Sequence, residues 1–281
     1  MKNSSLHIPF AKIQGTGNDF ILVDNRSGLL ENIELSELAP RICDRKFGVG
    51  SDGLITFGKN RNGEWVMTYK NPDGSDAGMC GNGARCFVKF AQMLGEINGN
   101  EQTGTMEFRV HENLYEAEIT GDQIRIRFPL RTKAEAITVD GDSLIQVYTN
   151  TEHIVYPVEP EMLDREETLI ETGRALRNHE SFAPKGTNVN FLYGTAEDRL
   201  LLQTYERGVE TLTLACGTGA IASALAWHSL QEKPEGDFTY YVRTRGGTII
   251  ILFSFDEKTQ TYTNISLEGP AEFVFEGTYY L

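Results

Sequence analysis

Two cysteines of this chain stand in the same short motif, Cys-Gly-Xaa-Gly, and each motif opens an apolar segment of helical length. The first motif reads MCGNGARC around Cys80, and the second reads ACGTGAIA around Cys216. A cysteine at a helix N-terminus is unusually acidic, because the free N–H groups and the helix dipole stabilise its thiolate. The same N–H groups bind carboxylates, so each motif predicts a reactive thiol beside an anion site. The backbone groups concerned belong to Gly81, Asn82, Gly217 and Thr218.

A pair of such cysteines suits inversion at the α-carbon of an amino acid. One thiolate would remove the α-proton, and the other thiol would return a proton to the opposite face. The substrate carboxylate must then hold the developing charge, and each backbone N–H donor that stabilises such charge contributes about 3–4 kcal/mol. The sequence therefore predicts a two-base racemase or epimerase. Neither Cys43 nor Cys86 is the first residue of a Cys-Gly-Xaa-Gly motif, so both are expected to be core residues.

Short strands surround each motif. QIRIRF, at 123–128, alternates apolar and charged residues, as a half-buried strand does. The two predicted helices, at 81–94 and 217–230, are apolar on nearly all sides, which is typical of buried helices. We predict an α+β fold of two domains, each a set of strands wrapped around a central buried helix. The predicted domains are 1–130, carrying Cys80, and 131–281, carrying Cys216, with the extreme C-terminus able to return to the first domain.

Composition and net charge limit the classes of partner that the chain is expected to bind. The 281 residues include 40 acidic and 26 basic side chains, and the net charge of −14 argues against a nucleic-acid partner. Neither a signal peptide nor a membrane-spanning stretch is evident, so no membrane partner is expected. The four cysteines have no disulfide or metal-binding spacing, which predicts a cytoplasmic protein without a metal. The expected partner is a small amino acid, and a homodimer is compatible with the sequence.

Four segments resemble the signature motifs of the diaminopimelate epimerase family. They are KIQGTGNDFILVD (12–24), NPDGSDAGMCGNGARCF (71–87), GTNVNF (186–191) and YERGVE…LACGTGA (205–220). The resemblance implies two pseudo-symmetric domains with the active site in the cleft between them. It also implies interconversion of LL- and meso-2,6-diaminopimelate without a cofactor, neither metal nor pyridoxal phosphate, in the biosynthesis of lysine and peptidoglycan precursors.

By the same resemblance, Cys80 and Cys216 are the catalytic pair, and the four backbone positions named above hold the reacting carboxylate. An arginine can bind a carboxylate through two parallel hydrogen bonds, and a glutamate can pair with an ammonium group. Asparagines beside glycines are also common in turns, and a Glu-Arg pair is common at a solvated strand edge. The residues that the resemblance assigns to the distal, non-reacting end of the substrate are Asn18, Asn71, Asn188, Glu206 and Arg207.

The chain departs from the family pattern at 149–153, where TNTEH stands in place of a Gly-Asn-Pro-His type of motif. His153 aligns with the family histidine, and it is expected either to orient or tune the cysteines or to be structural. Thr151 stands where a substrate-contacting asparagine is usual, and Glu152 stands where proline is usual. Recognition of the distal end is therefore in question. The segment before Cys216 also lacks the acidic residue that is common near Leu212.

Other functions stay open from the sequence. A racemase of the same fold could act on another amino acid, although MCGNG in place of MCGHG argues against the proline group. A cysteine-nucleophile hydrolase, with His153 as the base, would use one cysteine and leave the other idle. A binding protein that has lost its chemistry would need neither cysteine. A pyridoxal enzyme is formally possible, because its lysine has no local signature.

Overall fold

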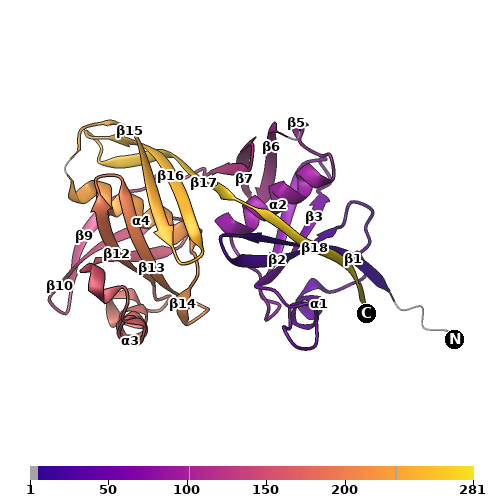
Figure 1. Cartoon of the computed structure of the whole chain (residues 1–281), viewed down its shortest axis with the longest axis horizontal. Coiled ribbons are helices and arrows are strands. Elements are labelled where there is room, and N and C mark those ends of the chain that lie inside the picture. Colours follow the sequence, from indigo (N-terminus) through magenta and orange to yellow (C-terminus); the bar gives the residue numbers. More distant parts are fainter. Residues whose placement is uncertain (1–5, 101, 232) are drawn as a thin grey trace. The chain divides into compact units, whose positions relative to one another are not determined.

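The computed structural model describes residues 6–100, 102–231 and 233–281. The chain divides into two compact units (Figure 1). Unit 1 contains Met1–Ile126 and Gly269–Leu281, and unit 2 contains Arg127–Glu268. Strands predominate in both units, and each unit contains a long buried helix, so the predicted α+β fold is confirmed. No helix in the described ranges is long and apolar enough to cross a membrane.

Unit 1 is built on β1, which pairs antiparallel with β2 and with the C-terminal strand β18. β2 pairs parallel with β3, and β3 pairs antiparallel with β4. β6 is antiparallel to both β5 and β7. The strands are β1 (His7–Gly15), β2 (Asn18–Asp24), β3 (Gly53–Lys59), β4 (Trp65–Lys70), β5 (Asn98–Gly99), β6 (Thr103–Val110), β7 (Asn113–Thr120), β8 (Gln123–Arg127) and β18 (Glu272–Tyr280). The helices are α1 (Leu35–Ile42) and α2 (Gly81–Met93).

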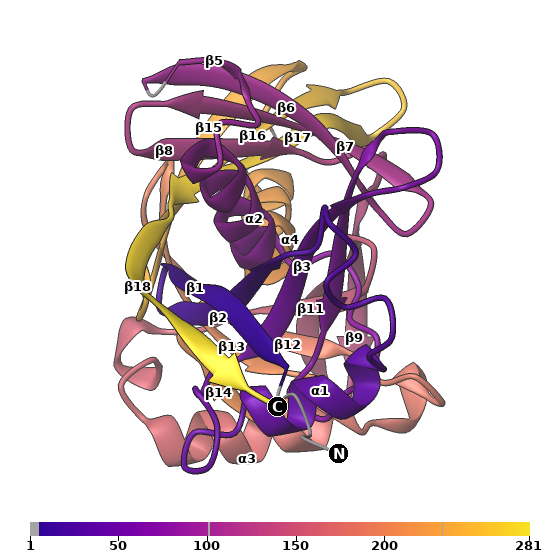
Figure 2. The same ribbon diagram turned by 90° about the vertical axis from the view of Figure 1, so that its right-hand side faces the viewer.

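Helix α2 is the core element of unit 1. Its residues from Gly81 to Val88 are all buried. The ring of Phe87 packs against Phe57 of β3 at 5.0 Å and against Phe108 of β6 at 5.1 Å between centroids. Strands therefore cover α2 on more than one side, as Figure 2 shows. This burial fixes the helix axis, and with it the direction of its N-terminus.

Unit 2 is built in the same manner around α4. β9, β10 and β11 form an antiparallel series, and β11 continues parallel to β12. β13 pairs with β12, β14 and β15, and β15, β16 and β17 complete the unit. The strands are β9 (Ala134–Val139), β10 (Asp142–Tyr148), β11 (Glu152–Pro157), β12 (Asn188–Ala196), β13 (Arg199–Glu206), β14 (Thr211–Thr213), β15 (Gly236–Thr244), β16 (Gly247–Asp256) and β17 (Thr261–Pro270). The helices are η1 (Pro160–Met162), α3 (Glu166–Arg177), η2 (Glu180–Phe182) and α4 (Gly217–Leu230).

Helix α4 is buried along nearly its whole length. Every residue from Gly217 to Ala226 is buried, and small alanines let the surrounding strands approach closely. Its closest neighbours include β10, β11 and β12. His153 of β11 and Asn188 of β12 lie directly opposite each other in the parallel pairing of these strands. Two predicted site residues thus lie side by side because of strand register.

Candidate active site

Cys80 occupies the N-cap position of α2. Its backbone is extended, with φ −114° and ψ 116°, and its Sγ accepts a hydrogen bond from the backbone N–H of Gly83 at 3.4 Å. A sulfur atom that accepts a helical N–H is stabilised as the thiolate. The side chain is partly exposed, so it remains accessible to a ligand. This geometry is what an acid–base thiol requires.

Asn18, at the start of β2, faces this cysteine. The Sγ of Cys80 lies 3.7 Å from the Oδ1 of Asn18, and the Nδ2 of Asn82 donates to the same oxygen at 3.3 Å. The Nδ2 of Asn18 donates to the Oδ2 of Asp52 at 2.6 Å. A carboxylate accepts but cannot donate when it is ionised, so Asp52 fixes the Asn18 amide with its oxygen toward Cys80. The structure thus brings Asn18, Cys80 and Asn82 together.

Asn71 has a different local role. Its Nδ2 donates to the Oγ of Ser75 at 3.0 Å, and its backbone N–H donates to the carbonyl of Ser75 at 3.0 Å. The turn that these bonds close contains Gly74, whose φ is +85° and where an added Cβ would lie 2.1 Å from the carbonyl oxygen of Ser36. The Asn71 side chain is engaged within this turn and makes no described bond to Asn18 or Cys80.

Cys216 occupies the N-cap position of α4, with φ −117° and ψ 111°. Its side chain is buried, and its Sγ lies 3.6 Å from the Oγ1 of Thr218. The same hydroxyl lies 3.1 Å from the Nε2 of His153. His153 therefore reaches Cys216 through the Thr218 hydroxyl.

The position of the ring proton on His153 follows from its other neighbour, Asn190. Both amide hydrogens of Asn190 have acceptors, because Nδ2 donates to the carbonyl of Ile154 at 2.9 Å and to the Nδ1 of His153 at 3.1 Å. The Oδ1 of Asn190 accepts from the Oγ1 of Thr204 at 2.9 Å. Nδ1 of His153 is thus an acceptor, and the ring proton sits on Nε2.

Two consequences follow for the thiol. Burial lowers the pKa of His153 to about 3, with the Arg207 charge acting in the same direction, so the imidazole is neutral near pH 7. Its Nε2–H donates to the Thr218 hydroxyl oxygen, which leaves the hydroxyl hydrogen for the Sγ of Cys216. A hydroxyl that donates to sulfur stabilises the thiolate form.

The second glycine of each motif makes room for neighbouring protein atoms. A Cβ added at Gly219 would lie 2.4 Å from the Oδ1 of Asn190, well inside van der Waals contact. A Cβ added at Gly83 would lie 3.1 Å from the Cδ1 of Ile55. Gly219 is therefore required by the buried network behind Cys216 as much as by any ligand.

A second group of polar side chains gathers at the ends of β11, β12 and β13. The Oδ1 of Asn188 accepts from the backbone N–H of Arg207 at 2.9 Å, and its Nδ2 donates to the carbonyl of Glu152 at 2.9 Å. Arg207 donates from Nη1 to the Oε2 of Glu152 at 3.1 Å and from Nη2 to the Oγ1 of Thr151 at 2.8 Å. Glu206 ends β13 next to this arginine. The structure thus groups Asn188, Glu206 and Arg207 with the two unusual residues of TNTEH.

Sequence reasoning missed two residues that shape these groups, Asp52 and Asn190. The signal for Asn190 was present, because GTNVNF places it two positions after Asn188, on the same face of strand β12. Asp52 gave no local signal. It reaches Asn18 because β2 and β3 pair in parallel, with Phe20 opposite Gly53.

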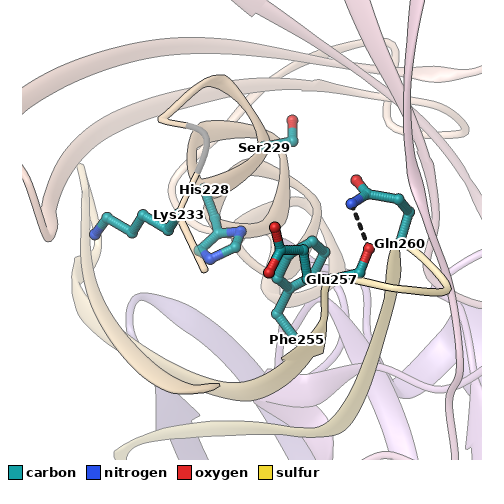
Figure 3. A pocket seen from close by; sticks show the side chains of 6 residues that line it. All are labelled: His228, Ser229, Lys233, Phe255, Glu257 and Gln260. Carbon is teal, nitrogen blue, oxygen red and sulfur yellow. Dashed lines mark hydrogen bonds between the residues drawn. The ribbon is translucent and has the colours of Figure 1, made fainter. Parts of the chain in front are cut away.

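Unit 2 also contains a cavity of about 190 Å³ at the far end of α4 (Figure 3). Its lining comprises His228, Ser229, Lys233, Phe255, Glu257 and Gln260. His228 is twelve residues after Cys216, so at 1.5 Å per residue the cavity lies roughly 18 Å from Cys216 along the helix. It contains none of the predicted site residues. Within the described residues, no group of three or more potential ligands is arranged to hold a metal ion.

Comparison with known proteins now identifies the family. The model of the diaminopimelate epimerase family matches residues 10–125 and 145–274. The diaminopimelate epimerase of Aquifex aeolicus is 38% identical over 285 residues, covering 95% of this chain and 96% of the relative. That of Chlorobaculum tepidum is 38% identical over 269 residues, covering 95% and 99%.

Solved structures agree on the fold. A hydroxyproline epimerase from Agrobacterium vitis superimposes with a TM-score of 0.74 at 12% identity, covering 100% of this chain and 94% of that one. A phenazine biosynthesis protein of the PhzF family from Bacillus anthracis gives a TM-score of 0.74 at 14% identity, covering 98% and 99%. At such identities the likeness concerns the fold alone. The family match and the relatives that align over nearly their whole length show that this chain belongs to the diaminopimelate epimerase family.

Proposed function

We propose that this chain interconverts LL- and meso-2,6-diaminopimelate by a two-base mechanism in which Cys80 and Cys216 exchange protons with the α-carbon. Membership in the family makes the chain an isomerase, an amino-acid epimerase of lysine and peptidoglycan-precursor biosynthesis. One observation supports the mechanism above others. Each of the two cysteines is the N-cap of a long buried helix, where a thiolate and a bound carboxylate are both stabilised.

In the proposed reaction, a thiolate at Cys80 takes the α-proton, and the electron pair of the C–H bond passes into the substrate carboxylate. Backbone N–H groups at the two helix starts stabilise the resulting charge. The thiol of Cys216 then donates its proton to the opposite face of the carbon and is left as a thiolate. The reverse reaction exchanges the two roles, so no metal, pyridoxal phosphate or other cofactor is required. The donors proposed for the carboxylate belong to Gly81, Asn82, Gly217 and Thr218.

His153 has an orienting role in this proposal. A neutral imidazole with a pKa of about 3 is a poor proton acceptor near pH 7, so His153 is not the base that meets substrate. Instead it holds the Thr218 hydroxyl, whose hydrogen is directed at Cys216. The thiolate that forms when Cys216 gives up its proton is stabilised by that bond. A hydrolase that relied on His153 as base is disfavoured for the same reason.

Recognition of the distal end is proposed to centre on Arg207. This residue would bind the distal carboxylate, and Glu206 would pair with the distal ammonium group. Asn188 holds the backbone of Arg207 through its Oδ1. One alternative, a related epimerase that acts on another amino acid, is favoured by the departures at Thr151 and Glu152, because both residues bond to Arg207. The remaining proposed contacts, from unit 1, are Asn18 and Asn71.

The cellular location and the binding partners of the enzyme are also part of the proposed function. Four free cysteines and a thiol mechanism suit the reducing cytoplasm, where we place the protein. A net charge of −14 makes a nucleic-acid partner unfavourable. A homodimer through β18 is proposed because its apolar side chains are exposed on a strand that pairs with β1. They are Phe273, Val274, Phe275 and Tyr280.

Proton NMR of the purified protein with LL-diaminopimelate in D2O, under reducing conditions, tests the function. The proposal predicts loss of the α-proton signal and appearance of the meso isomer. Parallel samples with histidine, lysine and hydroxyproline test the alternative substrates. Turnover of one of these, with none of diaminopimelate, would overturn the proposed substrate while leaving an epimerase.

A further inference from the structure

Arg85 of α2 is a fully buried guanidinium without a carboxylate partner among the described residues. Its relative exposure is 0%. All of its hydrogen-bond acceptors are neutral. They are the Oγ1 of Thr16 at 2.9 Å, the carbonyl of Pro270 at 3.1 Å, the Oδ1 of Asn82 at 3.1 Å and the carbonyl of Gly81 at 3.4 Å. A buried charge normally has a counter-charge, because desolvation of an ion is costly.

The slot that holds this guanidinium is shaped for it. A Cβ added at Gly15 would lie 3.3 Å from Nη2, and a Cβ added at Gly269 would lie 3.4 Å from Cζ. Both positions lack side chains where the planar group passes. Burial lowers the pKa of Arg85 from its usual value, and the groups whose charge offsets that effect are Cys86 and Cys80. The guanidinium donates to the carbonyl of Gly81, the residue directly after Cys80, so its charge lies beside the N-terminus of α2.

Cys86 is unsuited to carry the compensating negative charge. It is completely buried, and burial strongly raises the pKa of its thiol, so it stays protonated. Cys80 is partly exposed and already accepts the Gly83 N–H. Between the two thiols near Arg85, only Cys80 has an environment that favours the thiolate.

Three carboxylates near Cys80 are already matched by other cations. Asp52 and Asp19 both pair with Arg45, at 2.7 and 2.8 Å, and Asp19 also pairs with Lys12 at 2.7 Å. On the segment that leads to Cys80, Asp76 pairs with Lys70 at 2.7 Å. These three carboxylates thus each have a positive partner, and Arg85 pairs with none of them.

Helix α4 carries no equivalent charge, since neither arginine nor lysine occurs in it. Arg85 is the fifth residue after Cys80, and the fifth residue after Cys216 is Ile221, which is fully buried. The imidazole that reaches Cys216 through Thr218 is neutral, and Arg207, the cation that acts on it, is paired with Glu152. The two helix starts share their extended N-cap geometry, and of the two helices only α2 carries a buried arginine.

We infer that Arg85 is a positioning residue whose buried charge makes Cys80 the cysteine that holds the thiolate in the resting enzyme, while Cys216 rests as a thiol. The free enzyme is then prepared to remove a proton with Cys80 and to deliver one with Cys216. The inference rests on the proposed pairing of these cysteines, but it concerns the protonation of the free protein. It can be tested without turnover.

The test is site-resolved alkylation by iodoacetamide as a function of pH, read by mass spectrometry. Cys80 is followed in a Cys216→Ser background, and Cys216 in a Cys80→Ser background. Because alkylation follows the thiolate fraction, its midpoint reports the thiol pKa. We expect the midpoint of Cys80 to lie at least about one pH unit, or tenfold in the thiol dissociation constant, below that of Cys216.

Variants of Arg85 then test whether its charge causes the low alkylation midpoint of Cys80. Arg85→Met should raise the Cys80 midpoint and slow its alkylation at pH 6.5 about tenfold, whereas Arg85→Lys, which keeps the charge, should restore most of the rate. Ile221→Met in the Cys80→Ser background is the matched control and should leave the Cys216 midpoint unchanged. A folded Arg85→Met protein with an unshifted Cys80 midpoint would overturn the inference. If that variant does not fold, equal midpoints for the two cysteines would overturn it as well.

Discussion

Arg207 donates to the Oε2 of Glu152 from Nη1 at 3.1 Å, so the arginine proposed to bind the distal carboxylate already has a carboxylate partner. Thr151 accepts from its Nη2 at 2.8 Å. These are the two positions at which TNTEH departs from the family pattern. Both residues therefore accept hydrogen bonds from the Arg207 guanidinium and hold it in place. The carbonyls of Lys185 and Gly186, each 3.3 Å from Nη1, are further acceptors.

Removing the Glu152 carboxylate should weaken substrate binding. Glu152→Ala leaves Nη1 of Arg207 without its charged acceptor, and a hydrogen bond between charged groups contributes about 1.5–3 kcal/mol. We expect KM for diaminopimelate to rise roughly tenfold, with kcat within about twofold, since about 1.4 kcal/mol corresponds to a factor of ten. Glu152→Gln keeps an oxygen for Nη1 and should change KM less than about threefold. Steady-state kinetics of both variants decide this, and an unchanged KM in Glu152→Ala would contradict it.

The hydroxyl of Thr218 should contribute to turnover. Thr218→Val removes the bond to Cys216 and leaves the Nε2–H of buried His153 without an acceptor, while the backbone N–H remains. We expect kcat to fall roughly tenfold, as for loss of one hydrogen bond to a charged group. Thr218→Ser keeps the hydroxyl and is the matched control, expected within about twofold of wild type. Equal kcat values in the two variants would show that the hydroxyl has no such role.

Gly219 should tolerate no side chain. In an open helix position, Gly→Ala stabilises by about 1 kcal/mol. Here the new Cβ would lie 2.4 Å from the Oδ1 of Asn190, which must move and release His153. We expect Gly219→Ala to lower the free energy of unfolding by about 2 kcal/mol, the cost of overpacking. Gly58→Ala, where the nearest atom is 3.9 Å away, is the control and should be near neutral in urea denaturation.

Two buried histidines predict a loss of stability in mild acid. Burial lowers the pKa of His153 to about 3 and that of His228 to about 4, against 6.5 in an unfolded chain. The folded state keeps both neutral, and the unfolded state takes up protons below pH 6.5. The stabilisation is therefore complete above pH 6.5 and is lost as the pH falls toward 4 and then 3. At pH 5 the loss is at most about 2 kcal/mol for each histidine.

Urea denaturation at pH 7.5 and pH 5.0 measures this difference. His228→Phe, placed among the rings of Phe238, Phe255 and Tyr262, should remove about half of it. Asp19, whose pKa is lowered to about 2, loses its contribution only below its usual value of 3.8, outside this window. The same free energy of unfolding at both pH values would rule out the histidine contribution.

Much of the fold could be predicted from the sequence, because the signals for it are local. The apolar stretches after Cys80 and Cys216 are the buried helices α2 and α4, and QIRIRF is strand β8. The contacts among site residues could not be predicted. Asn18 meets Asp52, and Arg85 meets Pro270, because strands distant in sequence pair in a particular register. The burial of Arg85 could not be predicted either, because a charged residue that interrupts an apolar helix is normally expected at the surface, and Arg85 is completely buried.

The central claim is that two cysteines, one in each unit, are both required for inversion. The measurement that tests it most directly is formation of meso-diaminopimelate from the LL isomer by Cys80→Ala and Cys216→Ala, with Cys43→Ala as the control for loss of a buried core thiol. General acid–base groups contribute about 10²–10⁴-fold, so each active-site variant should lose at least a hundredfold in rate while the control keeps most of its activity. Meso isomer formed at near wild-type rate by either active-site variant would contradict the two-base account.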